Sequence, residues 1–247
     1  MKNLFLFILI TSLLIVGCNK RENVANELQN QEAAATPVII SDAVTDLDGN
    51  CYNAIQIGHQ LWMAENLRVT KDCEGNEIAL GNEIHHKKPY RYNPAGIDSN
   101  VLEYGYLYNW EAARRACPKG WHLPTYDEWK ELADYVGGQS QYRCEGKDWK
   151  IAKSLASKEM WESKDKASTV GNNPDGNNGT GFCALPAGRY TGEYDGVGKY
   201  AFFWNATEND RDFAYLCALH FDHAGLGHTF TYKNHGLSVR CMKDIVN

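Results

Sequence analysis

Residues 220–228 combine side chains that could bind a metal ion, namely His220, Asp222, His223 and His228. Imidazole nitrogens and carboxylate oxygens are ligands that transition metals accept in proteins. If His220 and Asp222 share one face of a strand end, His223 or His228 can return a third donor from the hairpin. A hairpin with incidental polar side chains explains the same pattern, so these four residues stay candidates and no metal is assigned.

Residues 168–180 form a second polar segment, rich in Asn, Asp and Gly. Side-chain oxygens of this kind suit calcium. The spacing does not match an EF-hand loop, and Asn and Gly are also common where the backbone needs a positive φ. Calcium is therefore kept as a candidate here, and no other cofactor is expected.

Aromatic and polar side chains also gather around the late Gly-rich turns. A ring face can stack on the apolar side of a sugar while amides and carboxylates bind its hydroxyl groups, although packing in the core is the competing role for such rings. The candidate ligand surface consists of Tyr190, Tyr194, Trp204, Asn205, Glu208 and Asp210.

Motifs for catalysis are missing from the sequence. It has no Gly-x-Ser-x-Gly elbow, no Walker motif and no dinucleotide-binding glycine motif. Nothing in the spacing of Glu208 and Asp210 sets the separation that glycosidase carboxylates need. We therefore expect a binding module rather than an enzyme, with an extracytoplasmic oxidative or glycan-cleaving enzyme as the alternative.

Composition limits the class of protein. The chain has 247 residues, 43% of them hydrophobic and 23% charged, with a formal net charge of -6. These values exclude a disordered, collagenous or multi-span membrane protein. The acidic balance gives no electrostatic reason to bind a polyanion, so nucleic acid is not expected as a partner.

The N-terminal residues have the pattern of an export signal. Lys2 precedes an apolar run over residues 4–16 that ends in Gly17 and Cys18. Such a run is too short for a permanent transmembrane helix, and a small residue before Cys18 is typical of lipoprotein signal peptides. An ordinary signal peptide that ends in cysteine is the alternative. We expect a signal peptide at residues 1–18, lipidation at Cys18 and a polar tether at residues 19–36. The domain at residues 37–247 would then be held outside the cytoplasm, in the cell envelope, at the outer membrane or cell surface.

An exported chain is expected to form disulfides. The sequence has eight cysteines, and removal of Cys18 leaves seven, which is too many for sequence alone to pair. Cys51 and Cys73 each adjoin a Gly-containing turn, which makes a local bridge between them plausible. One cysteine must stay unpaired, and Cys144 is the candidate.

Local signals predict the main helices. Asn109 can cap a helix that runs through Cys117, where Pro118 ends it. Thr125 and Glu128 form a capping box. The apolar stripe that follows, Trp129, Leu132, Ala133 and Val136, indicates a helix that ends at Gly137 and Gly138. A third helical segment is expected from about Lys147 to Ser157.

Short strands account for most of the remaining apolar segments. Residues 37–80 are expected to form strands joined by turns at residues 48–50 and 74–76. In residues 213–219 both faces are apolar, which is typical of a central strand covered on two sides. The later strands are expected at residues 182–185, 200–204, 213–221, 228–232 and 237–242.

Four motifs occur in the order found in one known family. They lie at residues 48–67, 117–129, 181–188 and 236–241, and the second reads Cys-Pro-Lys-Gly-Trp-His-Leu-Pro-Thr-Tyr-Asp-Glu-Trp. Together they resemble the Fibrobacter succinogenes major paralogous domain over residues 44–244. The Leu-Pro-Thr-x-x-x-Trp element is also similar to the sulfatase-modifying, formylglycine-generating superfamily.

The resemblance implies an α+β, C-type-lectin-like domain that is braced by disulfides, with two main helices against short, twisted, mostly antiparallel strands. It also implies a bridge between Cys117 and Cys241. The other cysteines expected in bridges are Cys51, Cys73, Cys183 and Cys217.

Departures from the relatives count against oxidative chemistry. Formylglycine-generating enzymes use a closely spaced late cysteine pair, whereas Cys217 and Cys241 are far apart here. The iron-binding His-x-x-x-His-x-Glu pattern of the ergothioneine-type relatives is missing. Residues 204–210 resemble the strand end that holds calcium and sugar in C-type lectins, but Ala206 replaces an acidic ligand. We therefore expect a lipid-anchored, non-catalytic module that binds a polysaccharide or a surface protein, with a purely structural envelope role as a further alternative.

Overall fold

The computed structural model describes residues 37–84 and 87–245, which belong to one unit, Pro37–Asn247. The expected signal peptide, the lipidation site at Cys18 and the tether at residues 19–36 lie outside the described residues. Within the described part, no helix combines the length and the apolar composition that crossing a membrane requires.

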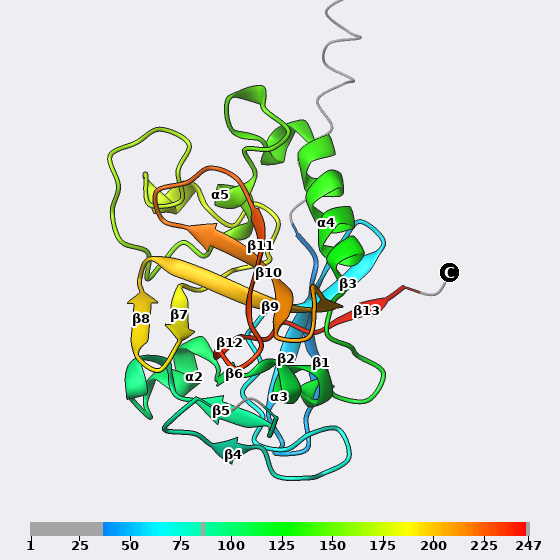
Figure 1. Cartoon of the computed structure of the whole chain (residues 1–247). Helices are drawn as coiled ribbons and strands as arrows, with labels where there is room; N and C mark the ends of the chain where they lie inside the picture. Colours follow the sequence, from blue (N-terminus) through cyan, green and yellow to red (C-terminus); the bar gives the residue numbers. More distant parts are fainter. Residues whose placement is uncertain (1–36, 85–86, 246–247) are drawn as a thin grey trace, which may run out of the picture. The chain divides into compact units, whose positions relative to one another are not determined.

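The N-terminal strands form a four-stranded antiparallel sheet with the C-terminal strand (Figure 1). Its order is β1 (Ile39–Thr45), β2 (Cys51–Ile57), β3 (Gln60–Met63) and β13 (Met242–Asp244). The expected turn after β1 is present, because the Asp46 carboxylate accepts hydrogen bonds from the amides of Asp48 and Asn50. The two ends of the described chain therefore contribute the two edge strands of one sheet.

A larger, mostly antiparallel sheet contains the remaining strands, with β7 and β8 attached beside β9. Its main order is β11 (Gly227–Tyr232), β10 (Phe213–His220), β9 (Tyr200–Glu208), β12 (Leu237–Ser238), β6 (Leu107–Tyr108), β5 (Tyr90–Tyr92) and β4 (Ala79–Leu80), and the attached pair is β7 (Ala187–Tyr190) and β8 (Tyr194–Val197). β10 lies between β9 and β11. Its Leu216 and Ala218 pack in one apolar cluster and its Cys217 and Leu219 in another, as expected of a strand covered on both faces.

Two of the expected strands differ in the structure. Residues 182–185 form only an isolated bridge from Ala184 to Ala156, because Phe182 turns into the core. Residues 237–242 split into β12 and β13, since the chain passes there from the large sheet to the small one.

Both main helices begin as the local signals predict. In α3 (Trp110–Ala116) the Asn109 side chain accepts a hydrogen bond from the Ala112 amide. In α4 (Tyr126–Gly138) both hydrogen bonds of the Thr125–Glu128 capping box are present, and Trp129, Leu132 and Val136 are buried. α4 contacts β2, β9 and β10, so it packs against both sheets (Figure 1).

The third expected helix is shorter than predicted. Only α5 (Ala152–Leu155) is helical. The residues before it form a turn in which the Cys144 amide donates to the Lys150 carbonyl and the Lys150 amide donates to the Lys147 carbonyl. The remaining short helices are α2 (Asn100–Tyr104) and the 3-10 turns η1 (Pro94–Gly96), η2 (Ser140–Tyr142), η3 (Cys144–Gly146) and η4 (Pro174–Gly176).

The core is aromatic where α4 meets the sheets. Trp62 and Trp129 are fully buried, with ring centroids 4.7 Å apart. Trp121 is only partly buried and packs against the neighbouring apolar cluster. Arg240 is also fully buried and donates hydrogen bonds to the Asn66 side chain and the Met63 carbonyl. This arginine joins the C-terminal segment to the chain that follows β3.

One disulfide, Cys117–Cys241, joins the end of α3 to the segment between β12 and β13, with 5.8 Å between the Cα atoms. This is the pair that the family resemblance implies. The expectation of further bridges is corrected, because Cys51, Cys73, Cys183 and Cys217 carry free thiols, as Cys144 does. Each of three thiols has different neighbours. The Cys51 sulfur contacts the Thr45 hydroxyl, the Cys217 sulfur contacts the His228 ring, and at Cys73 the backbone amide donates to the Arg115 carbonyl.

Taken together, the helices and strands of the described residues form a mixed α+β fold with mostly antiparallel sheets.

Candidate functional site

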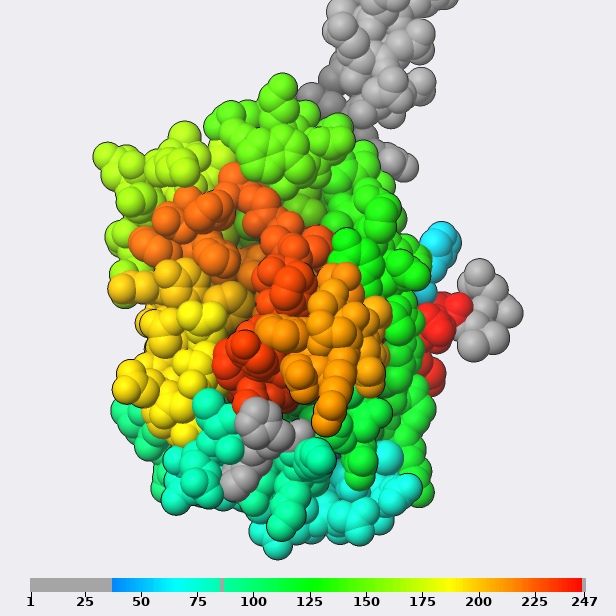
Figure 2. Space-filling model, in the orientation of Figure 1, coloured from blue at the N-terminus to red at the C-terminus, as the bar shows by residue number. Residues whose placement is uncertain are grey.

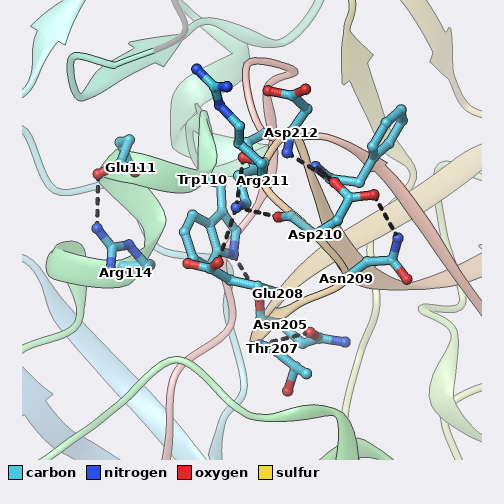
Figure 3. Close-up of polar contacts among 12 residues, drawn as sticks. Trp110, Glu111, Arg114, Asn205, Thr207, Glu208, Asn209, Asp210, Arg211 and Asp212 are labelled. Carbon is cyan, nitrogen blue, oxygen red and sulfur yellow. Dashed lines mark hydrogen bonds and ion pairs between the residues drawn. The ribbon is translucent and has the colours of Figure 1, made fainter.

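The polar groups of the loop between β9 and β10 form hydrogen bonds with neighbouring groups of the protein (Figure 3). The Asp210 carboxylate accepts hydrogen bonds from the amides of Asp212 and Phe213, each at 2.9 Å. Lys233 Nζ donates to the Asp210 carbonyl at 2.7 Å and lies 3.3 Å from the Glu208 carboxylate. Glu208 and Asp210 are exposed. Their carboxylates, however, already have partners within the protein, and those of Asp210 close the turn.

Three residues of the expected ligand surface are buried, which corrects that prediction. Trp204 and Asn205 are 0% exposed and Tyr190 is 3% exposed. Trp204 Nε1 donates to the Tyr108 carbonyl at 2.7 Å, and Tyr190 stacks on Tyr92 with 4.3 Å between ring centroids. These side chains connect strands within the large sheet. Only Tyr194, Glu208 and Asp210 of the expected set remain exposed.

The candidate calcium loop is occupied by a cation of the protein itself. Lys153 Nζ donates to the backbone carbonyls of Thr169, Asn172 and Asn173. The side chain of Asn177 donates to two further carbonyls. Since an ammonium group already satisfies the converging oxygens, the loop does not need a calcium ion to hold its shape.

A groove of about 600 Å³ lies beside α4 and was not predicted from the sequence. Its walls come from α4, from the segment after it and from the start of β11; Figure 2 shows the orange hairpin segment adjoining the green α4 on one face. The lining residues are Tyr126, Lys130, Ala133, Asp134, Gly137, Gly138, Arg143, Asp148, Trp149, Ile151, Leu226 and His228.

Trp149 is the largest exposed apolar side chain at this groove, with 58% of its surface accessible. A Cβ atom at Gly225 would lie 3.3 Å from Cε3 of this ring, so the glycine lets the hairpin turn approach the indole closely. On another side of the groove, the Tyr126 ring packs edge-on against Tyr215 and His228. Neighbouring residues therefore hold the aromatic groups at this groove in place.

Charged groups of both signs line the groove. Lys130 and Asp134 form an ion pair one helical turn apart, and this contact raises the pKa of Lys130. Nε of Arg143 is without a hydrogen-bond partner among the described residues. Burial lowers the pKa of His228, so its imidazole is neutral at pH 7. The groove offers hydrogen-bond donors and acceptors without a strong net charge.

A smaller hollow of about 330 Å³ lies next to the groove and shares Lys130 and Asp134 with it. It is lined by Tyr135, which is 40% exposed. A Cβ atom at Gly58 would lie 3.0 Å from the Tyr135 ring, so a glycine again supports an exposed aromatic side chain. The groove with Trp149 and the hollow with Tyr135 thus both adjoin the Lys130–Asp134 ion pair of α4.

The structure brings three of the four metal candidates together. One donor atom each from His220, Asp222 and His223 lies within 4.8 Å of the others. His228 is separate from this group, and its Nδ1 lies 3.3 Å from Cys217 Sγ. The strand register explains the separation, because His228 pairs with Cys217 and therefore lies away from the end of β10.

One overlooked feature of the residues before β11 points to the groove. Trp149 stands in a polar run, Lys147 to Lys150, without the apolar periodicity that places a ring in a helix or strand core. A large aromatic side chain in such a run is a candidate for exposure.

Comparison with known proteins identifies a family. The model of the Fibrobacter succinogenes major domain matches residues 55–243 of the chain. No curated protein and no solved structure shows a significant match.

Proposed function

The chain belongs to the Fibrobacter succinogenes major domain family, and from this premise we propose that it is a non-catalytic binding module of the cell envelope. The module has a C-type-lectin-like fold, is anchored through a lipid on Cys18, and binds a neutral polysaccharide in the groove beside α4. The family match, the mixed α+β fold and the leader sequence support this proposal.

The observation that carries the proposal is the exposed Trp149 ring at a groove lined by both donors and acceptors. Exposed indole surface is costly in water, and burying it against the C–H face of a sugar removes that cost. Side chains such as Arg143 and Asp148 are suited to the hydroxyl groups at the sugar edge.

The charges at the groove favour an uncharged glycan. Lys130 and Arg143 are matched by Asp134 and Asp148, so the lining has no excess of either sign. A polyanionic glycan would gain no net attraction from a lining whose charges cancel. The adjoining hollow with Tyr135 extends the surface along α4, which suits a chain of several sugar units.

A glycan-binding assay on the full chain tests the proposal. Neutral plant and microbial polysaccharides should bind, equally well with calcium and with a chelator, and Trp149→Ala should weaken binding at least tenfold, which is about 1.4 kcal/mol. Phe230→Ala is the matched control, since Phe230 is 49% exposed and does not line the groove. Failure of every neutral glycan to bind, or equal binding by Trp149→Ala, would contradict the proposal. New reducing ends on a bound glycan would instead favour the glycan-cleaving alternative.

Fatty-acid labelling tests the anchor separately. Cells that express the protein should incorporate labelled fatty acid into the wild type, and Cys18→Ala should abolish the labelling. Labelling that persists in Cys18→Ala would show that the chain is not lipidated at this cysteine.

A further inference from the structure

We infer that the turn after β10 binds a late first-row divalent transition metal ion, with Zn²⁺ as the reference ion and His220, Asp222 and His223 as the protein ligands. One donor atom from each of these residues lies within 4.8 Å of the other two. All three come from four consecutive positions, so the strand end and its turn hold them together without help from distant segments.

The donor distances are close to those of a zinc site. Zinc bonds of about 2.0–2.2 Å in tetrahedral geometry place two ligand atoms about 3–3.5 Å apart. The widest donor separation, which is at most 4.8 Å, therefore has to shrink by up to about 1.3–1.8 Å. Side-chain rotation can supply this shift, because the side chains of Asp222 and His223 are 34% and 63% exposed.

His220 is the anchored ligand of the three. Its ring packs against Tyr200 and Phe202, with centroid distances of 4.8 and 5.8 Å. The amide of His223 donates to the His220 carbonyl at 3.2 Å, which closes the turn.

The contact between Asp222 and His223 marks the place for a cation. Asp222 Oδ1 and His223 Nδ1 are 2.7 Å apart, a contact that requires a proton between them. A metal ion can replace that proton and bind both atoms, together with the third donor from His220. Three protein ligands leave one tetrahedral position for water.

The set of ligands decides which cations fit. Calcium and magnesium are held by several oxygen ligands, whereas this site has one carboxylate and two imidazoles. The Asp222 carbonyl already accepts a hydrogen bond from Lys166 Nζ at 3.4 Å. Coordination by two imidazoles favours the ions at the end of the first transition row.

The same turn leads into the binding groove. Gly225 lies against Trp149, and Leu226 lines the groove. An ion bound at Asp222 and His223 would therefore stiffen the segment that supports the exposed indole. The metal site stands whether or not the groove binds a glycan.

Metal binding is measured on the full, untagged chain after treatment with a chelator. Isothermal titration with Zn²⁺ should give one equivalent per chain, and Co²⁺ should produce visible absorption bands of a site with nitrogen ligands. His223→Ala and Asp222→Ala should each weaken Zn²⁺ binding at least tenfold. Thermal unfolding of the zinc-free variants checks that they fold, and Zn²⁺ should raise the melting temperature of the wild type more than that of these two variants.

Two controls separate this site from other histidines. His228→Gln should bind Zn²⁺ like the wild type, because His228 lies apart from the three donors. The double variant His85→Ala/His86→Ala should also bind normally, although the sequence places these two histidines side by side. Absence of binding in the wild type, or wild-type affinity in His223→Ala, would overturn the inference. Loss of binding in either control would do the same.

Discussion

Two polar regions of this domain, the loop between β9 and β10 and the groove beside α4, use similar residue types in opposite ways. In the loop, the carboxylate of Asp210 accepts two backbone hydrogen bonds, and the ammonium group of Lys233, from the segment after β11, donates to the Asp210 carbonyl. In the groove, the Trp149 ring is 58% exposed, and Nε of Arg143 is buried without a hydrogen-bond partner among the described residues. Polar composition therefore says little about function until the hydrogen-bond partners are known.

The difference is one of available interaction energy. A donor or acceptor that is already satisfied gains almost nothing from a ligand, because the ligand must first displace an internal partner. A group that faces water in a groove loses only hydration when the ligand binds. The loop should consequently affect stability and the groove should affect binding, and substitutions can separate the two.

The largest effect on stability is expected at the most internally satisfied polar group, Arg240. Arg240→Met should lower the free energy of unfolding by about 3–5 kcal/mol, because it leaves the carbonyl of Met63 and the side chain of Asn66 buried without their donor. Denaturant unfolding measures the loss. A change below about 1 kcal/mol would show that these groups find other partners.

A similar loss is expected from the inner face of α4, which forms one wall of the groove. Trp129→Ala should cost about 3–5 kcal/mol, since the ring is fully buried against Trp62 and Phe203. Tyr135→Ala, on the exposed face of the same helix, is the control and should change stability far less. Comparable losses for both variants in thermal unfolding would contradict the assignment of the two faces.

The cap at the start of α4 contributes less to the free energy of unfolding. Thr125→Ala should cost about 1 kcal/mol, because the Glu128 amide loses its acceptor and the Glu128 carboxylate loses the threonine hydroxyl. Thr125→Ser retains the hydroxyl and should recover most of the stability. An unchanged denaturation midpoint for Thr125→Ala would mean that the cap contributes nothing.

The loop itself supplies the direct test of the comparison. Asp210→Ala should lower stability by about 0.5–1 kcal/mol through loss of two backbone hydrogen bonds, and it should leave glycan affinity unchanged. Asp212→Ala, an exposed carboxylate in the same loop, should alter neither quantity. A loss of glycan affinity in Asp210→Ala would move the binding site to the loop.

A dependence of stability on pH is also expected, and it comes from His235. Burial lowers its pKa from 6.5 to about 4, so between these values the unfolded chain binds more protons than the folded one. The stabilisation is complete above pH 6.5 and is lost as the pH falls toward 4. His235→Gln should flatten the stability profile in this window. Parallel profiles for His235→Gln and the wild type would contradict this assignment.

Predictions from sequence succeeded where the deciding contacts are local. Thr125 and Glu128 are three residues apart, and Asn109 caps a helix whose third residue donates to it. Such contacts depend on residue types within one turn of helix. The helix expected from Lys147 was wrong in its extent, because the turn that replaces it closes onto Cys144.

Local residue patterns were enough to predict the two capped helices and the two-faced apolar strand β10, and the family resemblance was enough to predict the Cys117–Cys241 bridge. The burial of Trp204 and the exposure of Trp149 became known only from the folded chain. The physical reason is that exposure depends on segments far apart in the chain: Trp204 meets Tyr108 across the sheet, and Trp149 lies against Gly225. Neither neighbour is visible in the residues beside the ring.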